Sequence, residues 1–184
     1  AEPVKVAVVG AGQMGRLHAR VAVESDATEL AAVVDPDHAG ERVAWLGNTA
    51  WLRDVDALLD GARPDLAVFA VPGQEHKEVD LQLIEAGIAV LVEKPIADTL
   101  ENATAIADAA YANGVPLAVG HVERFNPAVS ALRERLAENQ IGRVFQVHTR
   151  RLSPFPTRIG DAGVALDMAT HDLDLMCELA GTPQ

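Results

Sequence analysis

Short apolar runs alternate with longer amphipathic segments over roughly the first 120 residues of the chain. The runs that read as strands span 4–9, 30–34, 66–70, 88–92 and 117–119. Segments with helical periodicity span 14–25, 40–46, 55–59, 75–86 and, capped by Asp98 or Thr99, the stretch up to Asn113. Alternation of this kind is typical of βαβ units on a parallel sheet. We therefore predict an α/β fold.

The pattern of apolar and polar residues changes after Gly120, where the sequence becomes polar and irregular. Beyond it the pattern predicts a helix over 128–138, a strand over 144–152 and a helix over 164–179. We predict two domains, 1–122 and 123–184, the second being the beginning of a truncated α+β domain. A lone strand leaves edges unpaired, so we expect either a longer parent protein or association to supply the rest of that sheet.

Composition excludes several classes of protein. The net charge is -12, from 27 acidic and 15 basic residues without a basic cluster, which disfavours nucleic acid as a partner. Cys177 is the single cysteine, which excludes an internal disulfide framework and fits a reducing compartment. The chain shows neither a signal-peptide pattern nor an apolar run of the roughly 18 residues that suggest a membrane span. We expect a cytoplasmic protein with no membrane partner.

A glycine-rich motif lies between the first strand and the first helix. Gly10, Gly12 and Gly15 match G-x-G-x-x-G, with Gln13 and Met14 inside the motif. The first glycine allows a tight turn, the second lets a pyrophosphate approach the backbone, and the third lets helix pack on strand. This pattern predicts a Rossmann dinucleotide-binding domain.

Asp35 ends the second strand, twenty positions after Gly15. A carboxylate there accepts hydrogen bonds from the adenosine ribose and repels a 2′-phosphate, which favours NAD over NADP. Its plain alternative is an ordinary strand-end aspartate, but strand, turn, helix and acid together favour the cofactor site.

Three further segments follow predicted strands at the edge where open α/β sheets bind ligands. Val71, Pro72 and His76 follow one strand, Glu93 and Lys94 follow the next, and Gly120 and His121 follow the last. His76 either covers the cofactor or caps its helix. Lys94 is either a surface cation paired with Glu93 or a functional group, and its position favours function.

These motifs together resemble the glucose–fructose oxidoreductase / inositol dehydrogenase (Gfo/Idh/MocA) family. Its most specific short motif is E-K-P, found here as Glu93-Lys94-Pro95. The resemblance implies that Lys94 reaches both the nicotinamide and the substrate hydroxyl. In the family the Lys–Pro bond of this motif is often cis, and the resemblance implies the same for Lys94–Pro95. The cofactor-binding residues that we expect are Gly10, Gly12, Gln13, Met14, Gly15, Asp35, Val71, Pro72, His76, Glu93 and Lys94.

The final predicted helix carries Asp167 and His171, four residues apart and hence on one face. Its polar face also holds Thr170, Asp174 and Glu178, and the opposite apolar stripe, expected to pack inward, holds Leu166, Ala169, Leu173 and Met176. Spacing alone favours a solvated polar face. The resemblance instead implies that Asp167 and His171 act with Lys94 in catalysis.

In that chemistry a hydride leaves a secondary alcohol carbon for nicotinamide. His171 is the expected general base, Asp167 orients its ring or holds a neighbouring hydroxyl, and Lys94 stabilises charge on the oxygen. We expect no metal, because the histidines lack compact ligand spacing.

Residues 120–127 and 161–174 resemble the branch that oxidises UDP-N-acetylglucosamine or its uronic acid at the 3-position. Arg124 and Asn126, and Arg150 or Arg151, either contact such a substrate or are solvated. Two alternatives remain: an inositol or simple hexose dehydrogenase, and a non-catalytic NAD-binding regulator, against which Lys94, Asp167 and His171 together argue. The family's second domain pairs subunits, so we expect a homo-oligomer.

Overall fold

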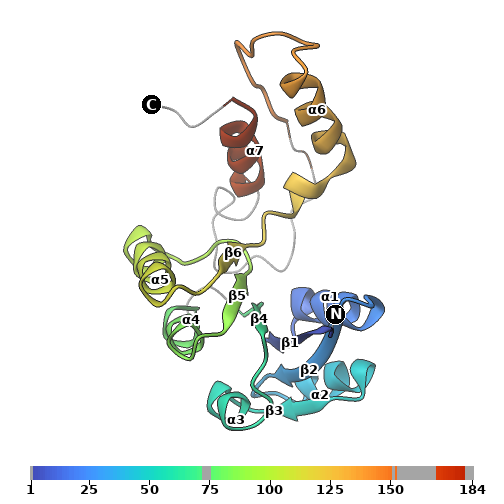
Figure 1. Ribbon diagram of the computed structural model, residues 1–184, viewed down its shortest axis with the longest axis vertical. Helices are drawn as coiled ribbons and strands as arrows, with labels where there is room; N and C mark the ends of the chain where they lie inside the picture. Colours follow the sequence, from blue (N-terminus) through green and yellow to red (C-terminus); the bar gives the residue numbers. More distant parts are fainter. Residues whose placement is uncertain (1, 72–75, 151, 153–168, 181–184) are drawn as a thin grey trace. The chain divides into compact units, whose positions relative to one another are not determined.

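The computed structural model describes residues 2–71, 76–150, 152 and 169–180 (Figure 1). The chain divides into two compact units, residues 1–120 and residues 121–184. Among the helices of the described residues, none has both the length and the apolar character that a membrane crossing requires.

The first unit is built on a six-stranded sheet in which every pairing is parallel (Figure 1). Its strands are β1 (Val4–Val9), β2 (Thr28–Val34), β3 (Ala50–Leu52), β4 (Leu66–Phe69), β5 (Ala89–Val92) and β6 (Leu117–Val119). Their order is β3-β2-β1-β4-β5-β6. This is the strand order of a doubly wound Rossmann fold, so the predicted fold is confirmed.

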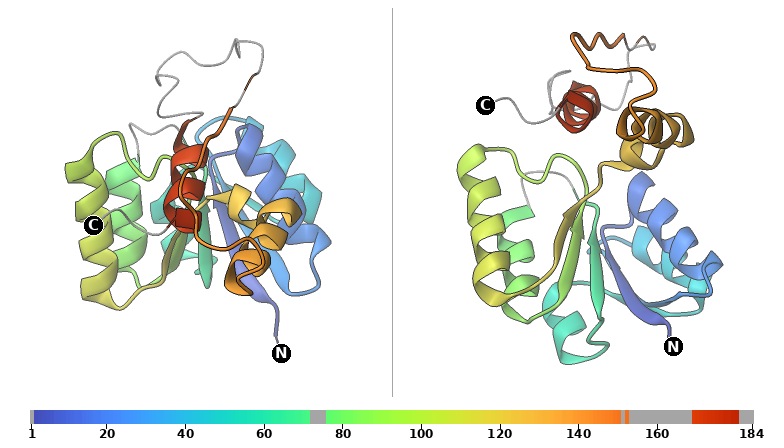
Figure 2. Two further views of the ribbon diagram at one scale, coloured as in Figure 1. Left: turned by 90° about the horizontal axis from the view of Figure 1, so that it is seen from above. Right: turned by 45° about the horizontal axis from the view of Figure 1, so that its top comes forward.

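Helices cover both faces of this sheet (Figure 2). They are α1 (Gln13–Glu24), α2 (Ala39–Ala44), α3 (Val55–Asp60), α4 (His76–Glu85) and α5 (Leu100–Asn113), with a 3₁₀ turn, η1 (Trp45–Gly47), after α2. Successive side chains of a strand point to opposite faces. Val6 and Val8 therefore pack with residues of α1 and α2, whereas Ala7 and Val9 pack with residues of α3, α4 and α5.

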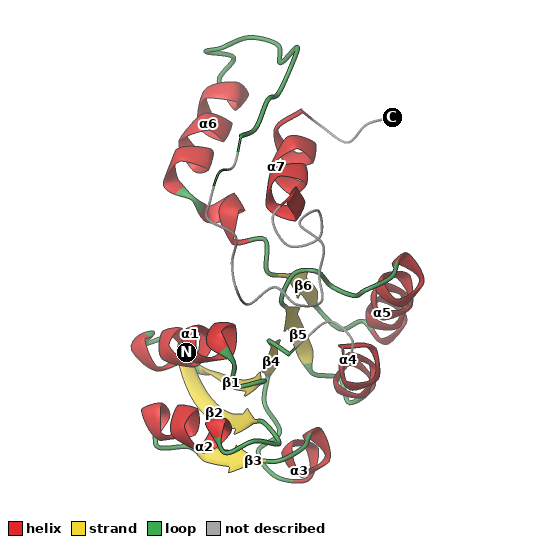
Figure 3. Ribbon diagram, turned by 180° about the vertical axis from the view of Figure 1, so that it is seen from behind, coloured by secondary structure: helices red, strands yellow, loops and turns green. Residues whose placement is uncertain are grey.

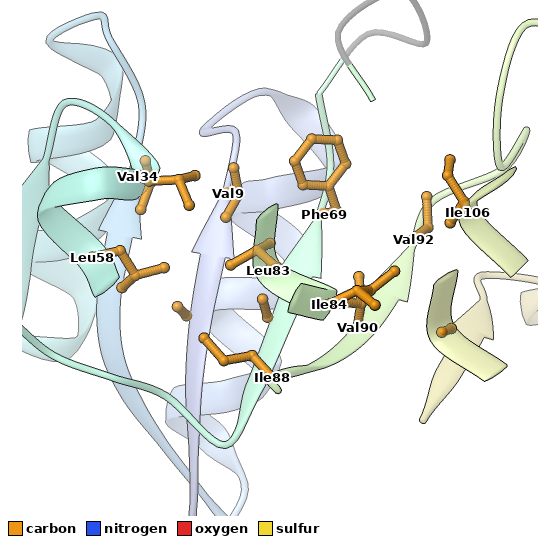
Figure 4. Close-up of a cluster of buried hydrophobic side chains, with 14 of the residues drawn as sticks. Val9, Val34, Leu58, Phe69, Leu83, Ile84, Ile88, Val90, Val92 and Ile106 are labelled. Carbon is orange, nitrogen blue, oxygen red and sulfur yellow. The ribbon is translucent and has the colours of Figure 1, made fainter. Parts of the chain in front are cut away.

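The larger core cluster lies between the sheet and α3, α4 and α5 (Figure 4). Phe69, Leu83, Ile84 and Ile106 are completely buried in it. Truncating one such side chain to alanine typically costs about 2–5 kcal/mol of stability. This core therefore stabilises the strands whose ends carry the loops of the candidate site.

Local signals explain where several elements begin and end. Thr99, rather than Asp98, caps α5, because its hydroxyl oxygen accepts the Asn102 backbone N–H at 3.2 Å. Gly87 follows α4 with a φ of +78°, the left-handed conformation predicted for a glycine after a helix. The pattern missed the three-residue strand β3, although it found β6, which is equally short.

The second unit contains η2 (Val122–Phe125), α6 (Pro127–Ala137) and α7 (Thr170–Ala180). The strand predicted over 144–152 is wrong for the part that the structure describes, since 144–150 and 152 are drawn as loop (Figure 3). Alternation alone does not make a strand, because its backbone groups need a partner strand to bond. The beginning of the predicted helix 164–179 lies outside the described residues.

Helix α7 also corrects the predicted inward-facing stripe. Leu173 is 57% exposed, whereas the side chains of Asp174 and Glu178 are only 8% and 18% exposed. Both acids are turned inward because arginines of η2 and α6 pair with them: Arg124 with Asp174 and Arg133 with Glu178. The ion pairs, rather than the apolar residues, orient this helix within its unit.

Candidate cofactor and active site

Four backbone hydrogen bonds hold the ends of β2, β1, β4, β5 and β6 level with one another. The N–H of Gly10 donates to Val34 O at 2.8 Å, and that of Ala70 donates to Val9 O at 2.8 Å. In the same way Glu93 bonds to Phe69 and Gly120 to Val92, at 2.9 and 2.8 Å. The glycine loop after β1 and the Glu93-Lys94 segment after β5 therefore lie along one edge of the sheet, the edge where such folds bind ligands.

The outer glycines of the motif are required by the protein itself. Gly10 has a φ of +93°, and a Cβ there would lie 2.7 Å from Ala70 O. A Cβ on Gly15 would lie 1.7 Å from Gly10 O, so only glycine lets α1 pack this closely on β1. These two positions explain the tight turn, but they do not by themselves indicate a ligand.

Gly12 is different, because nothing in the described part of the chain requires a glycine there. A Cβ on Gly12 would meet no heavy atom within 4 Å, and its φ of -66° suits any residue. As the N-cap of α1 it also provides no side-chain cap for the helix. The space and the helix start fit the pyrophosphate of a dinucleotide, which binds to exposed N–H groups at a helix N-terminus.

Asp35 lies directly beside this loop. Its Oδ2 accepts the backbone N–H of Ala11 at 2.6 Å, and its Oδ1 accepts that of Asp37 at 2.8 Å. The carboxylate is thus held at the end of β2, next to the turn where a ribose would follow the pyrophosphate. Its charge opposes a 2′-phosphate at this point.

A cavity of about 220 Å³ opens beside Asp35 at the same edge of the sheet. Its lining includes Val34, Pro36, Arg53, Phe69 and Val71. Asp54, Asp56 and Gln82 complete its polar lining, and apolar walls with a few polar groups suit a flat heteroaromatic base. Val71, predicted to bind cofactor, lines this cavity; Pro72 and the side chain of His76 lie outside the described part.

Glu93 and Lys94 follow β5, and the Lys94–Pro95 bond is cis, as the resemblance implies. Glu93 is 8% exposed, and Lys94 is half-buried. A Cβ on Gly120 would lie 3.2 Å from the Glu93 carboxylate, so a glycine at the end of β6 gives this side chain its room. Lys94 lies at the ligand edge of the sheet because β5 ends there.

The site residues predicted after residue 120 belong to the second unit. Arg124 forms a two-pronged ion pair with Asp174, at 2.8 Å from Nε and 2.5 Å from Nη2. Asn126 caps α6, since its Oδ1 accepts the N–H of Ala128 at 3.1 Å. These contacts give both residues a structural role, and their binding of substrate stays a prediction.

His171 lies on α7, near Asp174. The hydrogen bond from Arg124 keeps the pKa of Asp174 below its usual range despite burial, and the charges of His121 and His171 add to this effect. Asp167 lies outside the described residues, so the predicted Asp167–His171 pair is untested. Within the part that is described, no group of three or more His, Cys, Asp or Glu side chains is arranged to hold a metal.

Sequence reasoning missed His18, whose Nε2 lies 2.7 Å from Oε1 of Glu93. The signal was present: Gly15, Ala19 and Ala22 form the buried face of α1, and His18 adjoins that face. A polar residue there needs a partner inside the fold. The partner was invisible because it lies 75 positions away in the chain.

Known proteins resemble this chain over nearly its whole length. The family model described as an oxidoreductase family with an NAD-binding Rossmann fold (Gfo/Idh/MocA) matches residues 4–121. The UDP-N-acetylglucosamine 3-dehydrogenase of Acidithiobacillus ferrooxidans is 34% identical over 97% of this chain and 55% of its own length. Inositol 2-dehydrogenase 2 of Saccharopolyspora erythraea is 31% identical over 97% of this chain and 54% of its own length.

Among solved structures, that of GenD2 from gentamicin A biosynthesis, in complex with NAD, superposes with a TM-score of 0.86. It is 29% identical, and the match covers all of this chain and 55% of that one. The chain thus spans about half the length of the curated relatives that it matches.

Proposed function

Because this chain belongs to the Gfo/Idh/MocA oxidoreductase family, we propose that the protein is an NAD-dependent dehydrogenase that oxidises a secondary hydroxyl of a sugar or polyol. One observation carries the proposal: Lys94 follows β5 at the same edge of the sheet where Gly12 leaves room for a pyrophosphate. A dinucleotide bound along this edge runs from the Asp35 end toward the Lys94 end.

When bound, NAD supplies the hydride acceptor. The N–H groups at the start of α1 hold its phosphates, and Asp35 accepts hydrogen bonds from the adenosine ribose. The ammonium of Lys94 binds the substrate hydroxyl and stabilises negative charge on its oxygen as the C–H bond breaks. A cation fixed at this point does the work for which other enzymes use a Lewis acid.

The hydroxyl proton needs an acceptor, and we assign this role to His171, with Asp167 orienting its ring. This assignment rests on the sequence resemblance, in which the two residues stand four apart on one helix. An imidazole suits proton transfer near neutral pH.

For the substrate, we favour a UDP-N-acetylglucosamine-type nucleotide sugar oxidised at its 3-hydroxyl. The relative named for this activity supports the choice, at 34% identity. A cyclitol such as inositol is the second candidate, because a relative named for inositol oxidation is 31% identical. We further expect the protein to act in the cytoplasm. We also expect it to be a homo-oligomer, and light scattering of the purified protein would test this oligomeric state.

The direct test is a substrate panel with NAD. The whole protein is mixed with UDP-N-acetylglucosamine, its uronic acid or myo-inositol, and NADH is followed by absorbance. We expect NADH only with the nucleotide sugars. Reduction with inositol alone would establish the second candidate, and NADH binding without turnover of any sugar would favour a non-catalytic regulator.

A further inference from the structure

A side chain of helix α1 contacts the Glu93-Lys94 segment that follows β5. His18, one turn after Gly15, places Nε2 at 2.7 Å from Oε1 of Glu93. Since a carboxylate can only accept, the imidazole N–H is the donor. The helix that begins at the glycine loop is thereby tied to the residue immediately before Lys94.

The Glu93 carboxylate needs this donor. Burial alone would raise the pKa of Glu93, but the hydrogen bond and charge of His18, followed by the backbone N–H and charge of Lys94, bring it below its ordinary value. Glu93 is therefore an anion held in a nearly closed space, and an anion there is stable only with partners. His18 is the partner that comes from another element of the fold.

The same carboxylate also receives the backbone N–H of Lys94. A continuous path of contacts thus runs from the His18 imidazole through the Glu93 carboxylate to the main chain of Lys94. The backbone at Gly120 also lies close to this carboxylate, since even a methyl group there would lie 3.2 Å from Glu93. The carboxylate has little freedom while His18 holds it.

From this arrangement we propose that His18 is a positioning residue for Lys94, acting through the Glu93 carboxylate; the inference rests on the proposed dehydrogenase function. His18 does not touch substrate or cofactor in this account. It fixes the Glu93 carboxylate and, through it, the main chain from which the Lys94 side chain extends.

The alternative is that His18 only stabilises the fold. Two substitutions of His18 distinguish the positioning role from the purely structural role, because their side chains differ in length. In His18→Gln, the amide nitrogen occupies about the place of imidazole Nε2 and still donates to Glu93. In His18→Asn, the side chain has similar polarity but is too short to reach. Glu24→Ala is a matched control on the same helix, because the Glu24 side chain is 67% exposed and pairs with Arg20 on the helix surface.

Turnover and NADH affinity are measured for each variant of the whole protein. We expect kcat of His18→Asn to fall about 100-fold, because small misplacements of a catalytic group have such effects. His18→Gln should stay within about threefold of the parent, which is under 1 kcal/mol of barrier. The dissociation constant for NADH should change little in either variant, as should both quantities in Glu24→Ala.

A second readout does not depend on turnover. The chain has three lysines, Lys5, Lys77 and Lys94, so pulse acetylation followed by mass spectrometry reports Lys94 against two internal references. In His18→Asn the released Glu93 pairs with the ammonium and favours its charged form. The acetylation rate of Lys94 relative to Lys5 should then fall about threefold or more, and recover in His18→Gln.

These readouts distinguish the failure of each proposal. If no sugar is oxidised but the acetylation of Lys94 responds as expected, the dehydrogenase proposal fails and the positioning contact stands. If His18→Gln is as impaired as His18→Asn, or if Lys94 acetylation is the same in all variants, the positioning role is wrong. Equal losses of kcat and NADH affinity in His18→Asn would likewise overturn it.

Discussion

Two buried acids of the first unit occupy opposite situations. Among the described residues, Glu93 and Asp80 are the polar or charged residues classed as buried, at 8% and 0% exposure. Glu93 ends a strand at the ligand edge and has a donor at 2.7 Å. Asp80 lies inside α4, and neither of its carboxylate oxygens has a hydrogen-bond partner.

Their pKa values diverge accordingly. Partners bring the pKa of Glu93 below its ordinary value, whereas burial raises the pKa of Asp80 to about 7. Burial is common to both, so the difference comes from hydrogen bonding and nearby charge. A buried acid at the ligand edge is kept ionised beside Lys94, while one within the helical layer stays protonated below neutral pH.

The sharpest way to test this contrast is Lys94→Ala. We expect kcat to fall about 1,000-fold, or about 4 kcal/mol of barrier, because the cation that stabilises the reacting oxygen is lost. NADH affinity should stay nearly intact. Steady-state rates and a fluorescence titration with NADH measure both; an equal loss of the two would make Lys94 a structural or purely cofactor-binding residue.

Asp80 should move stability rather than rate. Its pKa of about 7 in the folded protein exceeds the ordinary value of 3.8 for the unfolded chain. The folded state thus holds the proton more tightly, and the associated stability is complete below pH 3.8 and is lost as the pH rises toward 7. Between about pH 5 and pH 8 the loss amounts to about 3 kcal/mol.

Urea unfolding at two pH values checks this sign. The parent should lose stability from about pH 5 to pH 8 relative to Asp80→Asn, which cannot ionise, by the amount just given. Since Asp80 is not one of the proposed site residues, kcat of the variant should match the parent. An identical pH dependence in both proteins would mean that Asp80 is not buried as an unpaired acid.

Asp35 is a third acid of the first unit, and its expected role is to favour NAD over NADP. Asp35→Ala removes the charge beside the ribose, so the preference for NAD over NADP should weaken about tenfold, or about 1.4 kcal/mol. Binding titrations with NADH and NADPH measure the ratio. Unchanged discrimination would remove the basis for assigning it to Asp35.

The smallest effect is expected in the second unit. Asp174 faces inward like Glu93, but its partner is Arg124, whose side chain is 45% exposed. Arg124→Ala should therefore destabilise the protein by only about 1 kcal/mol, read from a thermal melt, with Arg124→Lys intermediate because it cannot form the two-pronged pair. A loss of substrate affinity without loss of stability would instead support the predicted substrate contact.

The first unit was readable from the sequence because its signals are local. The side chains of Val6 to Val9 pack alternately into the two core clusters, and Gly10, Gly12 and Gly15 lie close together in one short motif. The cis bond before Pro95 came from the resemblance rather than from any pattern.

The missed features depend on distant partners. His18 meets Glu93 across 75 positions, and Asp174 meets Arg124 across 50. A hydrophobic period could not show that ion pairs turn Asp174 inward and leave Leu173 exposed. The predicted strand over 144–152 failed for the same reason, since a strand is defined by its neighbour.

The central claim is that a dinucleotide bound at the glycine loop presents its nicotinamide to Lys94. A crystal structure of the whole protein with NADH tests it most directly. We expect the pyrophosphate against Gly12, the adenosine ribose on Asp35, and the nicotinamide ring beside the Lys94 ammonium. A nicotinamide ring turned away from Lys94, or a dinucleotide bound elsewhere, would contradict the account.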